Sequence, residues 1–270
     1  MLILLLGKRA RLNRIINEES GKFVAITVDH AIARGVVNGL ENIEETIRKV
    51  AEGKPDAMTM HKGIADKVFA PYAGKIPLLL KSTSFAPYHM DFDVPVADVE
   101  EAIRLGADAI SVGLIVGGPE QKEQIAHLAK ISKSAFEYGM PLIAHAYPRG
   151  SLIEDQKDPD AVAYAVRTAV ELGVDIVKTN WNGSPEKFAK AVRAASPAKV
   201  VIAGGAPKND LASYFKMTEE AMQAGAFGVT FGRFVFADKD PAAVIAAVKS
   251  IVHHGKTAEE AMEVYKNFRK

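Results

Sequence analysis

A lysine interrupts the apolar stretch DIVKTN at residues 175–180. Side chains alternate between the two faces of an extended strand, so Ile176 and Lys178 share one face. A lysine inside a cavity must be paired, or its pKa must be lowered by desolvation and neighbouring cations. At an ordinary pKa of ~10.4 a lysine is neutral about once in two thousand at pH 7, and lowering that pKa by ~3 units costs ~4 kcal/mol. Such a cost is typical of a Schiff-base nucleophile. Lys178 is therefore a candidate nucleophile, and a structural ion pair with Asp29 is the alternative.

Side chains that can transfer protons lie at the ends of two further apolar runs. His145 and Tyr147 are two residues apart in the run AHAYP, so both can face the same cavity. A phenol can pass a proton to and from a hydroxyl that is cleaved or formed, although a lone tyrosine more commonly satisfies a buried hydrogen bond. Asp29 ends the run FVAITVD. It can orient a substrate hydroxyl, transfer protons, or pair with Lys178 or Lys81.

Short apolar runs alternate with longer amphipathic stretches along the whole chain. Eight runs have the length and composition of buried parallel strands: 23–28, 57–60, 77–80, 109–112, 141–146, 175–177, 199–203 and 228–231. Helical patterns between them cover 96–105, 121–138, 160–172, 185–194, 219–224 and 241–252. Three helix exits (LGADAI, LGVDIV and AGAFGV) carry the glycine that ends a helix before a strand. The pattern predicts a single (β/α)8 TIM barrel over residues 1–270, with residues 1–20 as an N-terminal extension or a plug at the bottom.

A barrel gathers the residues that follow its strands at one mouth. The side chains expected there are Asp29, His30, His61, Lys62, Lys81, Ser111, His145, Tyr147, Arg149, Lys178 and Asn180. Barrels often bind phosphate after strands seven and eight, where backbone N–H groups face the ligand. Those strands are followed by two pairs, Gly204-Gly205 and Gly232-Arg233. Glycine lets the backbone approach phosphate oxygens and arginine can add a bidentate contact.

Composition narrows the class of protein. The 270 residues include 34 Lys and Arg against 33 Asp and Glu, a net charge of +1, which argues against a nucleic-acid partner. The absence of cysteine excludes disulfides, cysteine nucleophiles and zinc–thiolate sites. The apolar start Met1–Leu6 is too short for a secretory signal or a membrane span. We expect a soluble cytoplasmic protein without a membrane partner.

A metal site is an alternative for the same mouth. His30, His61 and His145 all lie near predicted strand ends, with Asp29 beside them, and such a set could hold zinc. Strand geometry, however, sends the adjacent Asp29 and His30 to opposite faces. No H-x-H or H-E-x-x-H spacing occurs. We therefore expect no metal in the site.

Several motifs in order resemble a known family. They are VDHAIARG, HKGIADK, YPRG, ELGVDIVKTN, VIAGGAPK and GVTFGRFVF, and the match runs from about Lys22 to the C-terminus. Together they resemble the archaeal-type class I fructose-bisphosphate aldolases, a family that includes 2-amino-3,7-dideoxy-D-threo-hept-6-ulosonate synthase and the autoinducer-2 phospho-sugar thiolase.

The resemblance implies a role for each site residue. The Schiff-base lysine falls on Lys178, the acid/base tyrosine on Tyr147 and the strand-one aspartate on Asp29. The resemblance also implies that substrate phosphate is bound by Gly204, Gly205, Gly232 and Arg233. Lys81 and His145 are expected to contact substrate or phosphate. No cofactor is implied, since the lysine Schiff base takes that place, and a homo-oligomer, a decamer, is expected.

The expected function is a class I aldolase that cleaves or forms a C–C bond in a phosphorylated ketose, with fructose 1,6-bisphosphate as the default substrate. Heptulosonate synthase, a transaldolase-like enzyme, is the alternative, and the HKGI stretch is closer to that group. His145 stands where the aldolases carry Trp, and Ala31 replaces the glycine of D-H-G. The C-terminal IVHHGKTAEEAMEVY is closer to the thiolase, which lacks the tyrosine of Y-P-R-G. A metal-dependent barrel lyase and a non-catalytic sugar-phosphate binder are further alternatives.

Overall fold

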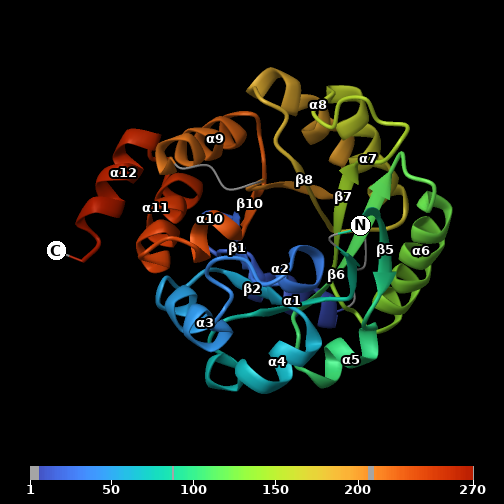
Figure 1. The fold of residues 1–270 in the computed structure, drawn as a ribbon, viewed down its shortest axis with the longest axis horizontal. Coiled ribbons are helices and arrows are strands. Elements are labelled where there is room, and N and C mark those ends of the chain that lie inside the picture. The colour runs from blue at the N-terminus through green and yellow to red at the C-terminus, as the bar shows by residue number, and fades with distance from the viewer. Residues whose placement is uncertain (1–5, 87, 206–209, 270) are drawn as a thin grey trace.

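Eight parallel strands close into a barrel in the computed structural model of this protein, which describes residues 6–86, 88–205 and 210–269 (Figure 1). The order around the barrel is β1-β10-β9-β8-β7-β6-β3-β2. The strands are β1 (Phe23–Thr27), β2 (Ala57–Met60), β3 (Leu78–Lys81), β6 (Ala109–Val116), β7 (Leu142–Pro148), β8 (Ile176–Asn180), β9 (Lys199–Ala203) and β10 (Gly228–Phe231). Each of the eight predicted runs forms one of these strands, which confirms the (β/α)8 barrel.

Strand alternation divides the apolar residues into an inner and an outer layer. Ile176 belongs to a small cluster inside the barrel, whereas Val177 belongs to the large cluster between the strands and the helices. Lys178 is the next inward-facing residue after Ile176. The strand therefore places the lysine above the inner apolar layer, toward the carboxyl-terminal mouth.

Helix α1 (Leu6–Ile15) lies at the opposite end of the barrel. Ile15 is fully buried in the inner cluster with Phe23 and Ala57, which begin β1 and β2. The apolar residues 1–5 lie outside the described part of the chain.

The helices surround the barrel (Figure 1). They are α2 (His30–Arg34), α3 (Ile43–Glu52), α4 (Lys62–Val68), the 3-10 turn η1 (Ala70–Tyr72), α5 (Val99–Arg104), α6 (Gln121–Glu137), α7 (Pro159–Glu171), α8 (Pro185–Ala195), α9 (Leu211–Gln223), α10 (Arg233–Phe236), α11 (Pro241–His254) and α12 (Ala258–Asn267). The expected glycines Gly106, Gly173 and Gly225 have φ values of +70°, +84° and +92°. These angles are the left-handed conformation that glycine adopts readily.

Several helices differ from the predicted ranges, among them α9 and α12. Helix α9 begins at Leu211 and not at residue 219, because the Asp210 side chain accepts hydrogen bonds from the backbone N–H groups of Ala212 and Ser213. Helix α12 was not predicted. It begins with a capping box between Thr257 and Glu260.

Strand β6 and the segment before it are also different from the prediction. β6 continues to Val116, so Ser111 lies within the strand and not at its end. The segment after β3, for which no strand or helix was predicted, forms a hairpin of β4 (Thr83–Ala86) and β5 (His89–Pro95). In the described ranges, no helix is both long and apolar enough to cross a membrane.

Candidate active site

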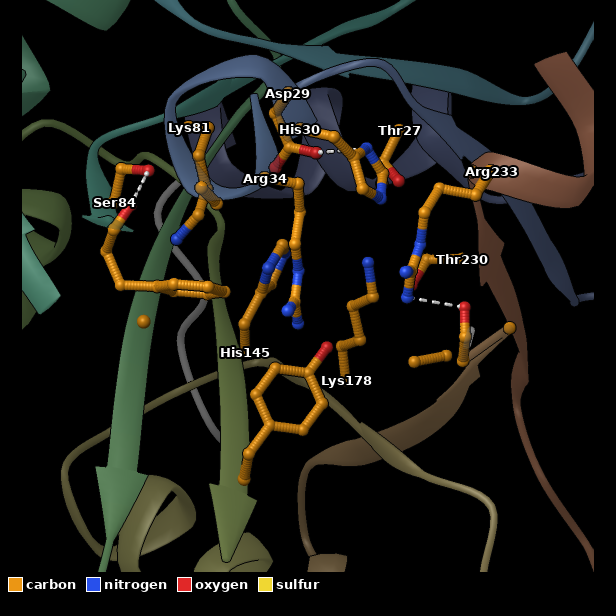
Figure 2. Close-up of a pocket in the computed structure, with 18 of the residues that line it drawn as sticks. Thr27, Asp29, His30, Arg34, Lys81, Ser84, His145, Lys178, Thr230 and Arg233 are labelled. Carbon is orange, nitrogen blue, oxygen red and sulfur yellow. Dashed lines mark hydrogen bonds and ion pairs between the residues drawn. The ribbon is translucent and has the colours of Figure 1, made fainter. Parts of the chain in front are cut away.

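A cavity opens at the mouth of the barrel. Figure 2 shows Lys81, His145, Lys178 and Arg233 arranged around it. All nine residues predicted for the site line this cavity: Asp29, Lys81, His145, Tyr147, Lys178, Gly204, Gly205, Gly232 and Arg233. The barrel therefore brings together residues from six of its strands or the segments that follow them.

Lys178 is buried at the wall of the cavity, with 6% of its surface exposed. Burial, together with the smaller effects of the charges on Lys81 and Arg233, lowers the pKa of its amine to about 8, while Asp29 acts in the opposite direction. No carboxylate in the described residues forms an ion pair with the amine. With a pKa of about 8, roughly one amine in ten is neutral at pH 7. The alternative of a structural ion pair with Asp29 is wrong, and the amine can act as a nucleophile.

Asp29 and His30 both face the cavity, which corrects the expectation that they point to opposite sides. β1 ends at Thr27 and α2 begins at His30, so strand alternation does not apply to these two residues. His30 Nδ1 lies 3.4 Å from Asp29 Oδ1. Burial lowers the pKa of His30 to about 4, against the opposite effect of Asp29, so the imidazole is neutral at pH 7.

The Asp29 carboxylate is ionised although it is buried. Burial raises its pKa, but His30, Lys178 and other cationic neighbours together lower it below its ordinary value. Since His30 is neutral at pH 7, the lysines supply the charge that matters there. A carboxylate next to a neutral imidazole can accept and pass on a proton.

His145 and Tyr147 share the inward face of β7, as predicted. Burial and the charge of Lys178 hold the pKa of His145 well below its ordinary value, so it is a neutral group. Burial raises the pKa of the Tyr147 phenol above its ordinary value, against a smaller effect of Arg149. Tyr147 is therefore protonated at neutral pH and can donate its proton to an oxygen that becomes negative.

The ends of β9 and β10 form one side of the cavity. Arg233 donates a hydrogen bond of 2.7 Å to the carbonyl of Gly205. A Cβ at Gly232 would lie 2.4 Å from Cε1 of His30, and a Cβ at Gly204 would lie 2.9 Å from Cε1 of Phe234. Glycine is needed at both positions because side chains from other segments approach the backbone there. The motif VIAGGAPK extends to residues 206–208, which lie outside the described residues.

Arg34 and Arg149 line the cavity together with the hairpin residue Phe85. Both guanidinium carbons lie 5.1 Å from the centre of its ring. The site prediction missed Arg34 and Phe85, although Arg34 lies one helical turn after His30 and that spacing was a usable signal. Phe85 carried no comparable signal.

Three residues expected at the mouth do not line the cavity. Ser111 lies inside β6, and Lys62 forms a 2.6 Å ion pair with Glu101 on α5. His61 is half-buried outside the cavity lining. Across residues 6–86, 88–205 and 210–269, no group of three His, Asp or Glu side chains is arranged to hold a metal ion.

The charge of the cavity suits an anionic ligand. Cationic side chains outnumber carboxylates: Lys81, Lys178, Arg34, Arg149 and Arg233 against Asp29 and Asp93. Arg233 lies beside the glycines, and the pair Arg34 and Arg149 lies around Phe85. A ligand with two negatively charged ends would neutralise both groups of cations.

Comparison with known proteins connects this site to a family. Residues 23–238 match the family model described as DeoC/LacD family aldolase. The 2-amino-3,7-dideoxy-D-threo-hept-6-ulosonate synthase of Halobacterium salinarum is 39% identical over 258 residues, which are 95% of each chain. The class 1 fructose-bisphosphate aldolase of Thermoproteus tenax is 31% identical over 251 residues, 90% of this chain and 94% of that one.

A solved structure agrees with these relatives. It is an archaeal fructose-1,6-bisphosphate aldolase with its catalytic lysine covalently bound to the carbinolamine intermediate of the substrate. It superimposes with a TM-score of 0.84 at 29% identity, covering 91% of this chain and 99% of that one. The chain therefore belongs to the DeoC/LacD aldolase family, as a class I enzyme that activates a ketone through a lysine Schiff base and not through a cofactor.

Proposed function

We propose that Lys178 is the Schiff-base nucleophile of this aldolase and that its substrate is a phosphorylated ketose. The observation that supports this role is the buried amine, whose pKa of about 8 leaves a usable fraction neutral at pH 7. The neutral amine adds to the ketone carbon and gives a carbinolamine. Loss of water from the carbinolamine gives an iminium ion. Asp29 and His30 lie beside the lysine and relay the protons of these two steps.

The iminium ion then allows the C–C bond to break. The electron pair of the bond between C3 and C4 of the ketose moves to form an enamine, and the C4 hydroxyl loses its proton as the aldehyde forms. In the cleavage direction Tyr147 accepts that proton while its phenol passes its own proton on to water in the cavity. In the condensation direction the phenol donates the same proton to the aldehyde oxygen. The raised pKa of Tyr147 keeps the proton available for condensation.

Phosphate is held in this proposal by the ends of β9 and β10. Gly204, Gly205 and Gly232 leave the backbone accessible, and Arg233 adds a guanidinium. His145 contacts the donor part of the substrate as a neutral group. Lys81 provides a second cation near Lys178, and it lowers the pKa of that amine.

Fructose 1,6-bisphosphate is the first substrate candidate. Its cleavage gives two three-carbon phosphates, and a phosphate at each end of the sugar suits the two groups of cations in the cavity. Arg34 and Arg149 then receive the second phosphate.

The synthase reaction is a second candidate, favoured by the 39% identity to the Halobacterium salinarum enzyme and by His145 in place of Trp. The named product of that relative has a ketone at C6 and an amino acid end. Breaking its bond between C4 and C5 gives a three-carbon ketone and a four-carbon amino aldehyde acid. Both reactions therefore use a three-carbon ketone bound to lysine. They differ in the aldehyde that accepts it and in the end of the ketone, which is a methyl group at C7 of the synthase product and carries a phosphate in the aldolase reaction.

One experiment separates these two candidates. The enzyme is incubated with fructose 1,6-bisphosphate alone and, in parallel, with the four-carbon amino aldehyde acid added, and the products are identified by mass. Triose phosphates in both reactions support the aldolase. A seven-carbon amino keto acid in the second reaction supports the synthase, and no carbon–carbon cleavage in either reaction contradicts the proposal.

We also propose that the chain assembles as a homo-oligomer, a decamer, and acts in the cytoplasm. The support is the resemblance of its motifs to the archaeal-type aldolases. Light scattering after size-exclusion chromatography measures the mass of the assembly, and a monomer of 29.1 kDa would contradict the first part. Cell fractionation tests the second part.

A further inference from the structure

Lys81 is held at the cavity wall through a hydroxyl and not by a direct ion pair. Its Nζ donates to Oγ1 of Thr83 over 2.8 Å, and that hydroxyl donates to Oδ2 of Asp93 over 2.5 Å. The backbone N–H of Gly113 also donates to Thr83 Oγ1, over 2.7 Å. Lys81 and Thr83 are both buried, so bulk water does not compete for these bonds.

The direction of each hydrogen bond in this network follows from the chemistry of its groups. A hydroxyl has one proton to donate and two lone pairs that accept. The ammonium of Lys81 and the N–H of Gly113 can only donate, so they occupy both lone pairs of Thr83. The hydroxyl proton is then left for the Asp93 carboxylate, which can only accept. The network has a single arrangement of protons.

Gly113 makes room for the carboxylate. A Cβ at this position of β6 would lie 1.4 Å from Oδ2 of Asp93 and 2.4 Å from its Cγ. Asp93 belongs to β5, and the neighbouring Val94 pairs with Ser84 on β4. The hairpin therefore inserts a carboxylate into a gap that the barrel strand leaves open.

We propose that Thr83 and Asp93 are positioning residues of the aldolase, which hold the Lys81 ammonium near Lys178 while keeping it apart from any carboxylate. The proposal rests on the proposed role of Lys178. A direct contact between Lys81 and Asp93 would bring the two charges together and cancel more of the positive field at Lys178, whereas an intervening hydroxyl separates the charges and retains more of that field. That field disfavours the protonated form of Lys178 and so increases the supply of nucleophilic amine.

Other groups act on Lys178 in addition to Lys81. Asp29 follows β1 and favours the ammonium form, while Arg233 from α10 acts in the same direction as Lys81. His145 on β7 faces the same cavity as a neutral ring. Loss of the positive field of Lys81 leaves burial and Arg233 to oppose Asp29, so the pKa of Lys178 rises.

The test measures how fast Lys178 captures a ketone at different pH values. Dihydroxyacetone phosphate is the probe, borohydride traps the iminium ion, and the rate is followed from pH 6 to pH 10 by intact mass. Thr83→Val keeps the shape of the side chain and removes the hydroxyl, whereas Thr83→Ser keeps the hydroxyl. We expect Thr83→Val to move the acidic limb of the plot of trapping rate against pH to higher pH by about half a unit or more. The trapping rate at pH 7 then falls by roughly threefold or more. Thr83→Ser should restore the wild-type profile.

Two further variants separate a positioning role from simple packing. In a Lys81→Met background, Thr83→Val should cause no additional shift, because the residue acts through Lys81. Asp93→Asn retains an oxygen that accepts from Thr83, so the acidic limb should not move to higher pH. Ser82→Ala is the matched control, since Ser82 is a buried neighbour whose hydroxyl donates to the Ser111 carbonyl and not to Lys81.

The outcomes distinguish this inference from the proposed function. If wild-type protein is not trapped at Lys178, the proposed function fails. If it is trapped and Thr83→Val has the wild-type pH profile, or shifts it equally with and without Lys81, the positioning role is wrong. Thr83→Ala, with the same expected shift, replaces Thr83→Val if the valine variant does not fold.

Discussion

Gly232 lies directly beneath the imidazole of His30. A Cβ at position 232 would lie 2.4 Å from Cε1 of that ring and 2.9 Å from the backbone oxygen of Thr27. The first residue after β10 is thus packed against the first helix after β1, where the barrel closes. The glycine has a structural role in addition to any contact with phosphate.

Gly232→Ala should therefore be destabilising and should also displace His30. Overpacking of this kind costs about 1–3 kcal/mol, which urea unfolding measures as a lower midpoint. Gly63→Ala is the control, because Gly63 lies in α4 and a Cβ there meets nothing within 4 Å. Equal stability of the two variants would contradict the packing described here.

Lys178→Met should stabilise the protein most at neutral pH. Burial lowers the pKa of Lys178 from 10.5 to about 8, so between these values the unfolded chain binds a proton that the folded protein does not. The contribution of Lys178 to the free energy of unfolding therefore rises with pH across that window. Below the window, the full cost of burying the charged amine, about 3 kcal/mol, applies. The difference in unfolding free energy between the variant and wild type should be largest at pH 7 and should shrink toward pH 10. A difference that is independent of pH would show that the amine has an ordinary pKa.

Tyr147→Phe should separate Schiff-base formation from bond cleavage. The variant keeps the ring and loses the proton that the C4 oxygen exchanges. Loss of a general acid–base group costs about 10²- to 10⁴-fold, so cleavage of fructose 1,6-bisphosphate should fall within that range. Borohydride trapping of dihydroxyacetone phosphate should stay within a few-fold of wild type. A variant that loses both activities equally would place Tyr147 earlier in the reaction.

Arg233→Ala and Arg34→Ala should affect different parts of the substrate. A hydrogen bond to a charged group is worth about 1.5–3 kcal/mol, so Arg233→Ala should weaken capture of dihydroxyacetone phosphate by roughly 10-fold or more. Capture of unphosphorylated dihydroxyacetone should fall much less, because loss of Arg233 then acts only through the pKa of Lys178. Arg34→Ala should leave the capture of both ketones unchanged and raise KM for fructose 1,6-bisphosphate. The same loss for both ketones in Arg233→Ala would argue against phosphate binding at this residue.

The sequence predicted the residues whose direction is set by a regular strand. His145, Tyr147 and Lys178 face the cavity because β7 and β8 alternate without a break. Asp29 and His30 were expected on opposite faces because the end of β1 at Thr27 was placed one residue late, at Val28. Side chains alternate between two faces only within an extended strand, so alternation did not determine the directions of Asp29 and His30.

The side-chain positions in the β4–β5 hairpin could not be predicted from the sequence. Residues 82–93 follow neither a clear strand nor a clear helix pattern, so Phe85 and Asp93 could not be placed near the barrel mouth. The position of Asp93 depends on the space above Gly113, which is a contact between segments distant in the chain. Arg34 is an intermediate case, because a short helix starting at His30 brings it to the same mouth.

The most direct test of the central claim is to locate the trapped lysine. Wild-type protein is treated with dihydroxyacetone phosphate and borohydride, digested, and mapped by peptide mass, with Lys178→Met and Lys81→Met treated in parallel. The account predicts one adduct, on the peptide that contains Lys178, in wild type and in Lys81→Met, and no adduct in Lys178→Met. An adduct on Lys81, or one that persists in Lys178→Met, would contradict the assignment of the nucleophile.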